Sequence, residues 1–383
     1  MSTDSECLRT DPAGVYVHVP FCERKCRYCG FYSEPVAAHD AGRVVSALIC
    51  ELDVYSHVAP VRTLYVGGGS PTCLPADSLG RLLEALRTHW PTAAEFTVEC
   101  NPGQTDAEML AMLRRAGVNR LSFGVQSFDD GQLALLGRRH SADDAVRALR
   151  LAREHGFDNV GLDLIFAVPG MTLETWRQNL ELAAALGVQH ISAYSLSIEE
   201  GTDLYRAAGA GEIAPVDENT DRAMYDLAID FLASAGFVQY EISNFARPGF
   251  ACQHNLSYWR NRSYVGIGPA AGSYLDGRRA MNVSSITEYV RRIEAGDSAV
   301  EQAEAIDKKE RICETAVLNL RAREGVDLTA FQVTTGVDFA QVFARPLECY
   351  RRQGLIEIEA GRVRLAREAL PIADAVLCDF ASF

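Results

Sequence analysis

The sequence predicts an α/β protein: a partial (β/α)6 TIM-like barrel followed by a smaller C-terminal α+β module with a winged-helix-like layout. Short apolar strand patterns alternate with amphipathic helical patterns from about residue 14 to 197, a rhythm typical of parallel strands joined by crossover helices. The rhythm stops after residue 200, where a turn-rich stretch leads into a new helical run. The tail carries helical patterns and then an alternating segment that is typical of a β-hairpin.

The individual elements follow from these patterns. The strands of the barrel are expected at residues 15–19, 63–66, 95–99, 120–124, 159–166 and 190–195. Helices between them are expected at residues 78–90, 106–117 and 173–187, and the last two end at a glycine, as helices often do. Later helices are expected at 217–235, 307–322 and 338–353, and a hairpin over 355–366 that turns at Ala360 and Gly361. We therefore divide the chain into a short tail (1–13), the barrel core (14–235), a connecting region (236–300) and the C-terminal module (301–383).

Composition narrows the class of protein. The chain has 383 residues, 48% of them hydrophobic and 23% charged, which is typical of a globular protein. Its formal net charge of −14 disfavours nucleic acid as a partner, since nucleic-acid binders usually display a basic patch. We find neither an export signal nor an apolar run long enough to span a membrane. The sequence therefore predicts a cytoplasmic protein that does not bind nucleic acid.

Three of the eleven cysteines cluster in the segment HVPFCERKCRYCGF. Cys22, Cys26 and Cys29 lie four and then three positions apart, so one loop can wrap a small inorganic core. Three thiolates leave one iron of a [4Fe–4S] cube without a protein ligand, and an exogenous ligand can occupy it. The amino and carboxylate groups of S-adenosylmethionine are a fitting chelate. The alternative is a structural zinc site, which usually needs four closed ligands and would recruit His18 as the fourth.

Further polar residues follow the predicted strands, where ligands bind in βα architectures. The run LYVGGGSPT, with Gly67 to Ser70, comes after the second strand, and we expect its backbone N–H groups to be exposed for close approach to a ligand. Glu99, Arg138 and Asp163 are suited to orient a cationic ligand rich in hydroxyl groups. Each of these three side chains could instead form an ordinary ion pair at the rim.

These residues resemble those of a known family, the coproporphyrinogen III dehydrogenase group of radical-SAM proteins. VYVHVPFCERKCRYCGF, YVGGGSPT, VECNP, SFGVQSF, LGRRHS and GLDLIFAVPG all occur in the expected order, and the match covers nearly the whole chain. The resemblance implies that Cys22, Cys26 and Cys29 carry a [4Fe–4S] cluster. It also implies that S-adenosylmethionine is surrounded by Tyr16, Gly68, Gly69, Ser70, Glu99, Gln126, Arg138 and Asp163.

The group has two branches, and two features separate them. The dehydrogenase branch has a fourth cysteine two positions after the third and a long segment before the first strand. This chain has Phe31 at that position, which we count among the cofactor-binding residues, and about a dozen residues before the first strand. These departures count against porphyrinogen decarboxylation and leave open whether the chain is an enzyme.

The segment HNLSYW, residues 254–259, resembles the signature of the other branch, the haem chaperones. His254 can offer a neutral imidazole to haem iron, and Tyr258 and Trp259 offer large faces against which a porphyrin can lie. The alternative is a histidine in a turn beside aromatic core residues.

The leading hypothesis is a haem chaperone that binds a [4Fe–4S] cluster, S-adenosylmethionine and haem, and transfers haem to apo-haemoproteins. The resemblance implies partners among the haem proteins of the respiratory chain, a cluster-dependent homodimer, and at most peripheral contact with the inner face of the membrane. The alternative is an oxygen-independent coproporphyrinogen III dehydrogenase of porphyrin biosynthesis. A third hypothesis is a radical enzyme that acts on another tetrapyrrole.

Overall fold

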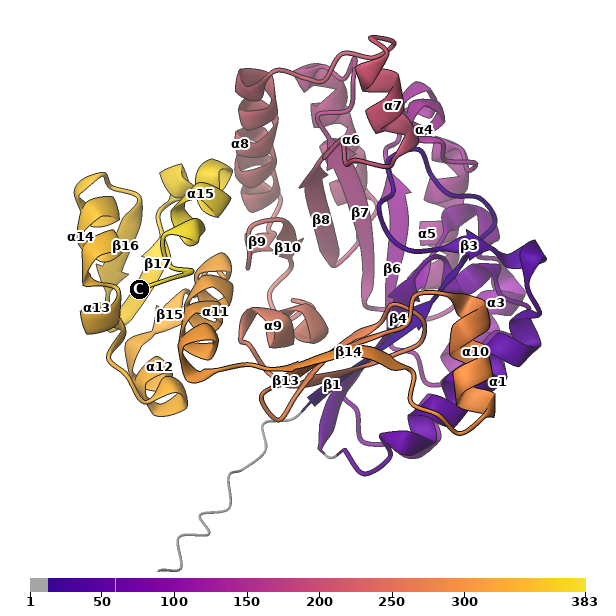
Figure 1. Cartoon of the computed structure of the whole chain (residues 1–383). Coiled ribbons are helices and arrows are strands. Elements are labelled where there is room, and N and C mark those ends of the chain that lie inside the picture. The colour runs from indigo at the N-terminus through magenta and orange to yellow at the C-terminus, as the bar shows by residue number, and fades with distance from the viewer. Residues whose placement is uncertain (1–12, 59) are drawn as a thin grey trace, which may run out of the picture.

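The computed structural model describes residues 13–58 and 60–383, and a curved twelve-stranded sheet forms its centre (Figure 1). All six predicted barrel strands are present and lie parallel and adjacent in chain order. They are β1 (Ala13–Val19), β4 (Val61–Gly68), β5 (Glu95–Cys100), β6 (Arg120–Gln126), β7 (Val160–Phe166) and β8 (His190–Ser195). The predicted partial barrel is therefore confirmed. Apart from Ala13, the predicted tail at 1–13 lies outside the described residues.

Helices cover the outer face of this sheet (Figure 1). They are α1 (Ala41–Val54), α2 (Ala76–His89), α3 (Ala107–Arg115), α4 (Asp130–Leu136), α5 (Ala142–Glu154), α6 (Leu173–Ala185) and α8 (Glu218–Ser234). The apolar stripe of each long helix packs on strand residues such as Val15, Val17 and Val66, which are fully buried. Side chains at the N-caps fix where helices begin: Asp106 accepts from the Met109 amide, and Ser141 forms a capping box with Asp144.

The chain that follows α8 supplies the strands at both edges of the sheet. β9 (Val238–Gln239) and β10 (Asn244–Ala246) continue the sheet antiparallel beyond β8. At the other end β11 (Tyr264–Ile267) pairs in parallel with β1, and β12 (Gly272–Leu275), β13 (Arg278–Asn282) and β14 (Val300–Ala305) follow. Between them lie α9 (Gln253–Trp259) and α10 (Ile286–Glu294). β9 to β12 have two to four residues each, too few for a periodic signal.

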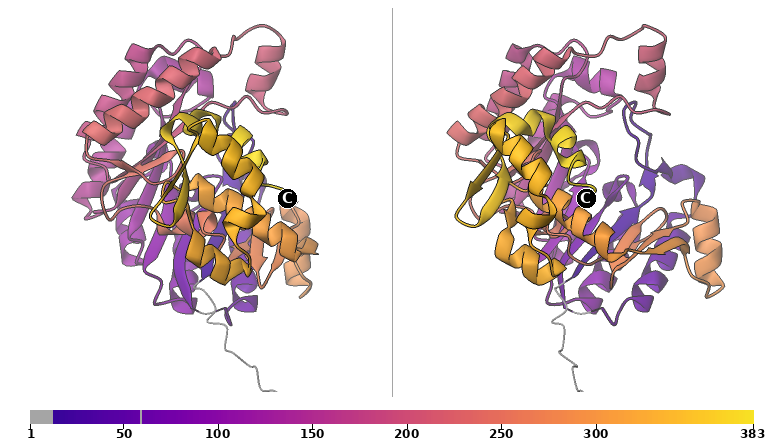
Figure 2. Two further views of the ribbon diagram at one scale, coloured as in Figure 1. Left: turned by 90° about the vertical axis from the view of Figure 1, so that its left-hand side faces the viewer. Right: turned by 60° about the vertical axis from the view of Figure 1, so that its left-hand side comes forward.

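The C-terminal module consists of helices and a small antiparallel sheet of order β15-β17-β16. It contains α11 (Lys308–Arg321), β15 (Val326–Asp327), α12 (Leu328–Thr335), α13 (Phe339–Val342), α14 (Ala344–Arg352), β16 (Ile356–Glu359), β17 (Arg362–Leu365) and α15 (Ala373–Cys378). Figures 1 and 2 place it beside α8 and α9, on the side of the sheet away from α10.

Two predictions for this module have different outcomes. The hairpin is confirmed, and Ala360 and Gly361 turn it with positive φ angles of 50° and 76°. The single helix expected at 338–353 is wrong, because it is two helices, α13 and α14. Pro346 explains the break, since its ring would clash with the carbonyl of Val342 in a continuous helix.

Within the described ranges, 13–58 and 60–383, no helix is both long and apolar enough to cross a bilayer.

Candidate functional site

The three clustered cysteines lie on a loop that leaves the end of β1. Its two ends are held together by a short parallel pair, β2 (Phe21–Cys22) and β3 (Glu34–Pro35). Its middle is held from two distant elements: the Arg27 amide donates to the Leu136 carbonyl over 3.0 Å, and the Leu204 amide donates to the Arg27 carbonyl over 2.9 Å. Leu136 ends α4, and Leu204 is in the first turn of α7 (Asp203–Gly209). The barrel thus fixes the loop at several points along its length.

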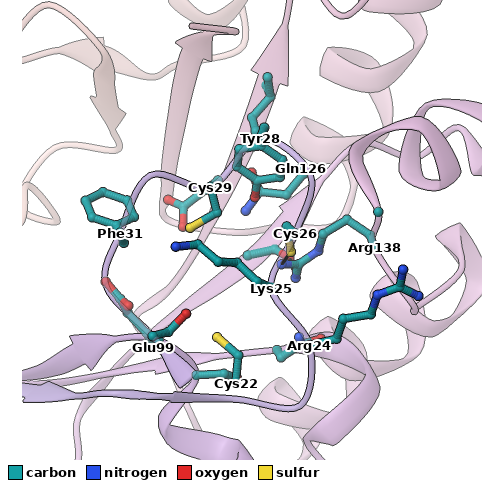
Figure 3. Close-up of a pocket in the computed structure, with 18 of the residues that line it drawn as sticks. Cys22, Arg24, Lys25, Cys26, Tyr28, Cys29, Phe31, Glu99, Gln126 and Arg138 are labelled. Atoms are coloured by element: carbon teal, nitrogen blue, oxygen red, sulfur yellow. Dashed lines mark hydrogen bonds between the residues drawn. The ribbon is translucent and has the colours of Figure 1, made fainter. Parts of the chain in front are cut away.

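All three thiols line one cavity of about 860 Å³ at the carboxyl ends of the strands. Figure 3 shows them facing this space from three positions along the loop, with Lys25 extending between Cys22 and Cys29. The three cysteines are not paired in disulfides, and burial raises the pKa of the Cys22 and Cys29 thiols. In the part of the chain that the structure describes, no three His, Cys, Asp or Glu side chains converge on a point suited to one metal ion. The thiols instead border a space large enough for a cluster of several atoms.

His18 is not a fourth ligand in this structure. Its Nε2 donates to the Tyr32 carbonyl over 3.0 Å, and its Nδ1 accepts from the Tyr16 hydroxyl over 3.0 Å. Both ring nitrogens are therefore occupied, and burial lowers the pKa of the imidazole. The role of His18 is to tie the far end of the cysteine loop to β1.

The glycine run after β4 packs tightly against its neighbours. A Cβ on Gly69 would collide with the Phe21 carbonyl, and one on Gly68, where φ is +105°, would meet the His18 ring. The expectation that these amides are exposed is wrong. The Gly68 amide donates to Glu99 Oε2 over 3.2 Å, the Gly69 amide to the Val19 carbonyl over 2.8 Å, and the Ser70 amide to the Phe21 carbonyl over 2.6 Å. The run lets the strand ends approach closely and leaves carbonyls and side chains to face the cavity.

Glu99 and Asp163 bring two carboxyl groups to the floor of the cavity. Glu99 accepts from the Tyr65 hydroxyl over 2.7 Å, yet burial and the nearby Asp163 raise its pKa to about 7. Burial likewise raises the pKa of Asp163. Two enclosed carboxyl groups with raised pKa values would be stabilised in their charged form by a cationic ligand.

Arg138 is the partly buried cation of this cavity. It donates from Nη2 to the Gly124 carbonyl over 2.6 Å and from Nη1 to Cys26 Sγ over 3.5 Å. Its Nε is inaccessible to solvent and has no partner among residues 13–58 and 60–383. The Gly124 carbonyl is presented by a bulge at the end of β6, where Gln126 has a φ of +70°. The orphaned Nε fits the carboxylate of a bound ligand.

The structure brings most of the predicted site residues together. Those that line the cavity are Cys22, Cys26, Cys29, Phe31, Gly68, Gly69, Ser70, Glu99, Gln126, Arg138 and Asp163. Phe31 is 72% exposed and lies at the edge of the cavity (Figure 3). Tyr16 does not line the cavity, and its hydroxyl donates to His18.

His254 lies elsewhere, near the amino ends of β1 and β4. It is buried on α9, where Nδ1 pairs with Thr63 Oγ1 at 2.8 Å and Nε2 with the Tyr258 hydroxyl at 2.9 Å. Burial and then the charge of Arg120 lower its pKa to about 3, so the ring is neutral. The aromatic residues of the motif are packed as well: Trp259 lies under Arg321 of α11, and Tyr258 meets Tyr264 edge to face. In this conformation the motif joins the barrel to the C-terminal module.

Some cavity residues escaped the sequence analysis. Gln104 accepts from Ser70 Oγ over 2.6 Å, and Tyr28, Tyr194 and Glu199 line the same space. Their positions in the chain could have revealed two of them. Tyr194 is the last residue but one of the sixth barrel strand, and Gln104 follows the third, and the other site residues were sought at such strand ends.

Comparison with known proteins agrees with this geometry. Residues 16–183 match the Radical SAM superfamily, and residues 306–372 match the HemN C-terminal domain. The chain is 34% identical over 374 residues to the protein named Heme chaperone HemW of Bacillus subtilis, covering 96% of this chain and 98% of that one. The chain belongs to the HemW family of radical SAM proteins. HemW of Escherichia coli is 39% identical over 285 residues, which cover 71% of this chain and 73% of that one.

An animal protein is also similar to this chain, and the fold is shared more widely. The mouse protein named Radical S-adenosyl methionine domain-containing protein 1, mitochondrial, is 32% identical and covers 95% of this chain and 86% of its own length. The solved structure of coproporphyrinogen III oxidase (HemN) of Escherichia coli superimposes with a TM-score of 0.83 at 23% identity, over 97% of this chain and 90% of that one. At that identity the likeness shows the fold alone. Membership of the superfamily implies a [4Fe–4S] cluster and S-adenosylmethionine, and the cavity offers thiols, carboxylates and the guanidinium of Arg138 for them.

Proposed function

We propose that this chain is a haem chaperone, which binds haem and transfers it to apo-haemoproteins. The observation that carries the proposal is its similarity to proteins named Heme chaperone HemW over nearly its whole length. Phe31 supports it as well. The dehydrogenase branch has a fourth cysteine at this position, and this chain does not.

The residues of the cavity divide between two cofactors. Cys22, Cys26 and Cys29 hold the cluster. Arg138 would pair with the carboxylate of S-adenosylmethionine, a role that its unpartnered Nε supports, and Glu99 and Asp163 would favour the positive charge of that ligand. When bound, the pair supplies one-electron chemistry to the site.

His254 is our candidate for the ligand of haem iron. Its neutral ring is the form that coordinates iron. Because both nitrogens are paired in this structure, coordination through Nδ1 requires α9 to move away from β1 and β4 and to break the bond to Thr63. Tyr258 lies on α9 as well, so its bond to Nε2 can move with the helix. We therefore propose that haem binding is coupled to opening of α9, which would also loosen its joint with the C-terminal module.

The partners and the location are part of the proposal. We infer that haem is delivered to haemoproteins of the respiratory chain, that the protein is cytoplasmic with peripheral contact at the inner face of the membrane, and that it forms a cluster-dependent homodimer. Gel filtration of the cluster-free and cluster-loaded protein tests the last point, and identical elution volumes would refute it.

The decisive experiment is anaerobic reconstitution with iron and sulfide, followed by haem titration and mixing with an apo-haemoprotein. Haem binding and recovery of haem in the acceptor support the proposal. Incubation of the same preparation with coproporphyrinogen III, S-adenosylmethionine and reductant tests the dehydrogenase alternative. Formation of protoporphyrinogen IX together with a failure to bind haem would replace our proposal with that enzyme.

A further inference from the structure

Arg138 makes a contact that its assignment to the S-adenosylmethionine site does not explain. Its Nη1 donates to Cys26 Sγ over 3.5 Å, a normal length for a hydrogen bond to sulfur, while Nη2 is anchored on the Gly124 carbonyl at 2.6 Å. A guanidinium is planar and rigid, so the anchor on Gly124 fixes the direction of the bond to the sulfur.

The backbone around Arg138 is fixed as well. α4 ends at Gly137, which has a left-handed conformation, and the Arg138 amide donates to the Leu133 carbonyl over 2.8 Å. Two residues before Arg138, the Leu136 carbonyl accepts from the Arg27 amide. The end of α4 therefore forms hydrogen bonds with two consecutive residues of the cysteine loop. Arg138 bonds Cys26 through its side chain, and Leu136 bonds Arg27 through the backbone.

The other arginine and lysine side chains that border the cavity are exposed, unlike that of Arg138. Arg24 and Lys25 are exposed. Arg139, the next residue along the chain, is also exposed and pairs with Glu23 at 3.3 Å. Charges in water are screened, whereas a partly buried charge that donates to a ligand sulfur acts at close range.

We propose that Arg138 is a positioning residue that raises the reduction potential of the cluster through its hydrogen bond to Cys26. Hydrogen bonds to the sulfur ligands and nearby charge are known determinants of the potential of an iron–sulfur cluster. Reduction adds one electron to the cluster, so a fixed cation on a ligand sulfur stabilises the reduced form more than the oxidised form. This rests on the proposal that the three cysteines hold a [4Fe–4S] cluster, and it does not depend on whether the protein carries haem.

The test is a redox titration of the anaerobically reconstituted protein, with dithionite as the one-electron donor and the EPR signal of the reduced cluster as the readout. It is done without S-adenosylmethionine, so that the role of Arg138 toward that ligand cannot contribute. We expect Arg138→Gln to lower the reduction equilibrium constant by about tenfold, which is about 59 mV for one electron.

Arg139→Gln is the matched control, because it removes a neighbouring cation that does not touch a cysteine. It should leave the potential unchanged. Arg138→Lys keeps the charge without the rigid fork and should lower the potential by less than Arg138→Gln. If Arg138→Gln fails to assemble the cluster, Arg138→Lys becomes the test of the proposal. A cluster potential in Arg138→Lys equal to that of the wild type would then overturn it.

Two further results would also overturn it. One is an equal shift in the Arg138 and Arg139 variants, which would indicate a general effect of charge. The other is an unchanged cluster potential in Arg138→Gln together with weaker binding of S-adenosylmethionine. That result would show that Arg138 acts on that ligand and does not tune the cluster. Absence of acid-labile sulfide in the wild-type protein would instead refute the cluster itself.

Discussion

The Nε2 of His18, in β1, donates a hydrogen bond to the carbonyl of Tyr32, fourteen residues further along the chain. The three cysteines lie between these two residues. The Nδ1 of the same ring accepts from the Tyr16 hydroxyl, so one histidine joins the far end of the cysteine loop to the interior of the barrel.

We expect His18→Leu to loosen the cysteine loop. The substitution removes two hydrogen bonds and leaves the buried Tyr16 hydroxyl without this acceptor, which should cost about 1–3 kcal/mol of unfolding free energy. Iron and sulfide retained per chain after exposure to a chelator should fall. His57→Leu is the control, because that exposed ring bonds the Val54 carbonyl and is remote from the cysteine loop in sequence. Equal loss in both variants would contradict this role.

Gly69→Ala should destabilise the fold by about 2 kcal/mol or more, because the new methyl group would collide with backbone at Phe21 and neither strand end can easily move. Gly209→Ala is the matched control. It has open space around it and no positive φ, so its effect should stay within about 0.5 kcal/mol. Urea unfolding of the two variants measures the difference. Similar midpoints would show that the glycine run is not tightly packed.

Glu99→Gln should change how stability depends on pH. The folded state holds the pKa of Glu99 at about 7, above its ordinary value of 4.5. Between these values the folded state binds more protons than the unfolded state, so the free energy of unfolding falls as pH rises from 4.5 to 7. Above pH 7 the loss is complete, and it amounts to at most about 3 kcal/mol.

Glutamine cannot ionise, so the variant should lack this decline and be the more stable protein at pH 8. Denaturant unfolding of cluster-free wild-type and variant protein at pH 5 and pH 8 gives the comparison. The same decline in both proteins would show that other groups are responsible.

Thr63→Val and His254→Ala should affect haem binding in opposite directions. The valine removes the partner of His254 Nδ1 while keeping the size of the side chain. It leaves a buried nitrogen unpaired, at a cost of about 1–3 kcal/mol to the closed form of α9. If opening of α9 exposes the haem ligand, Thr63→Val should bind haem faster, and His254→Ala should lose stable haem while keeping the cluster absorbance. Stopped-flow haem binding distinguishes the two, and unchanged haem retention in His254→Ala would place the ligand elsewhere.

The barrel could be predicted because its signals are local. Residues such as Val15, Val17 and Val66 belong to short apolar runs, which are typical of buried strands. Polar residues follow directly at the carboxyl ends of these runs. Parallel strands then bring Cys22, Glu99 and Asp163 to one rim without further information. The same reasoning missed β11, whose four residues pair with β1 from more than two hundred positions away.

The roles of individual atoms could not be predicted in this way. The sequence suggested free amides in the glycine run, but Glu99 and the backbone of Val19 and Phe21 already accept from them. It also left His18 open as a metal ligand, and hydrogen bonds at both nitrogens decide against it.

By itself, the sequence determined the parallel barrel, the loop of three thiols and the family, because strand periodicity and the spacing of Cys22, Cys26 and Cys29 are properties of contiguous segments. Only the tertiary structure decided where His254 lies and what Arg138 touches. Its partners, Thr63 in one case and Cys26 in the other, come from distant segments, and hydrogen bonds depend on distances of a few ångströms that only the packed chain defines.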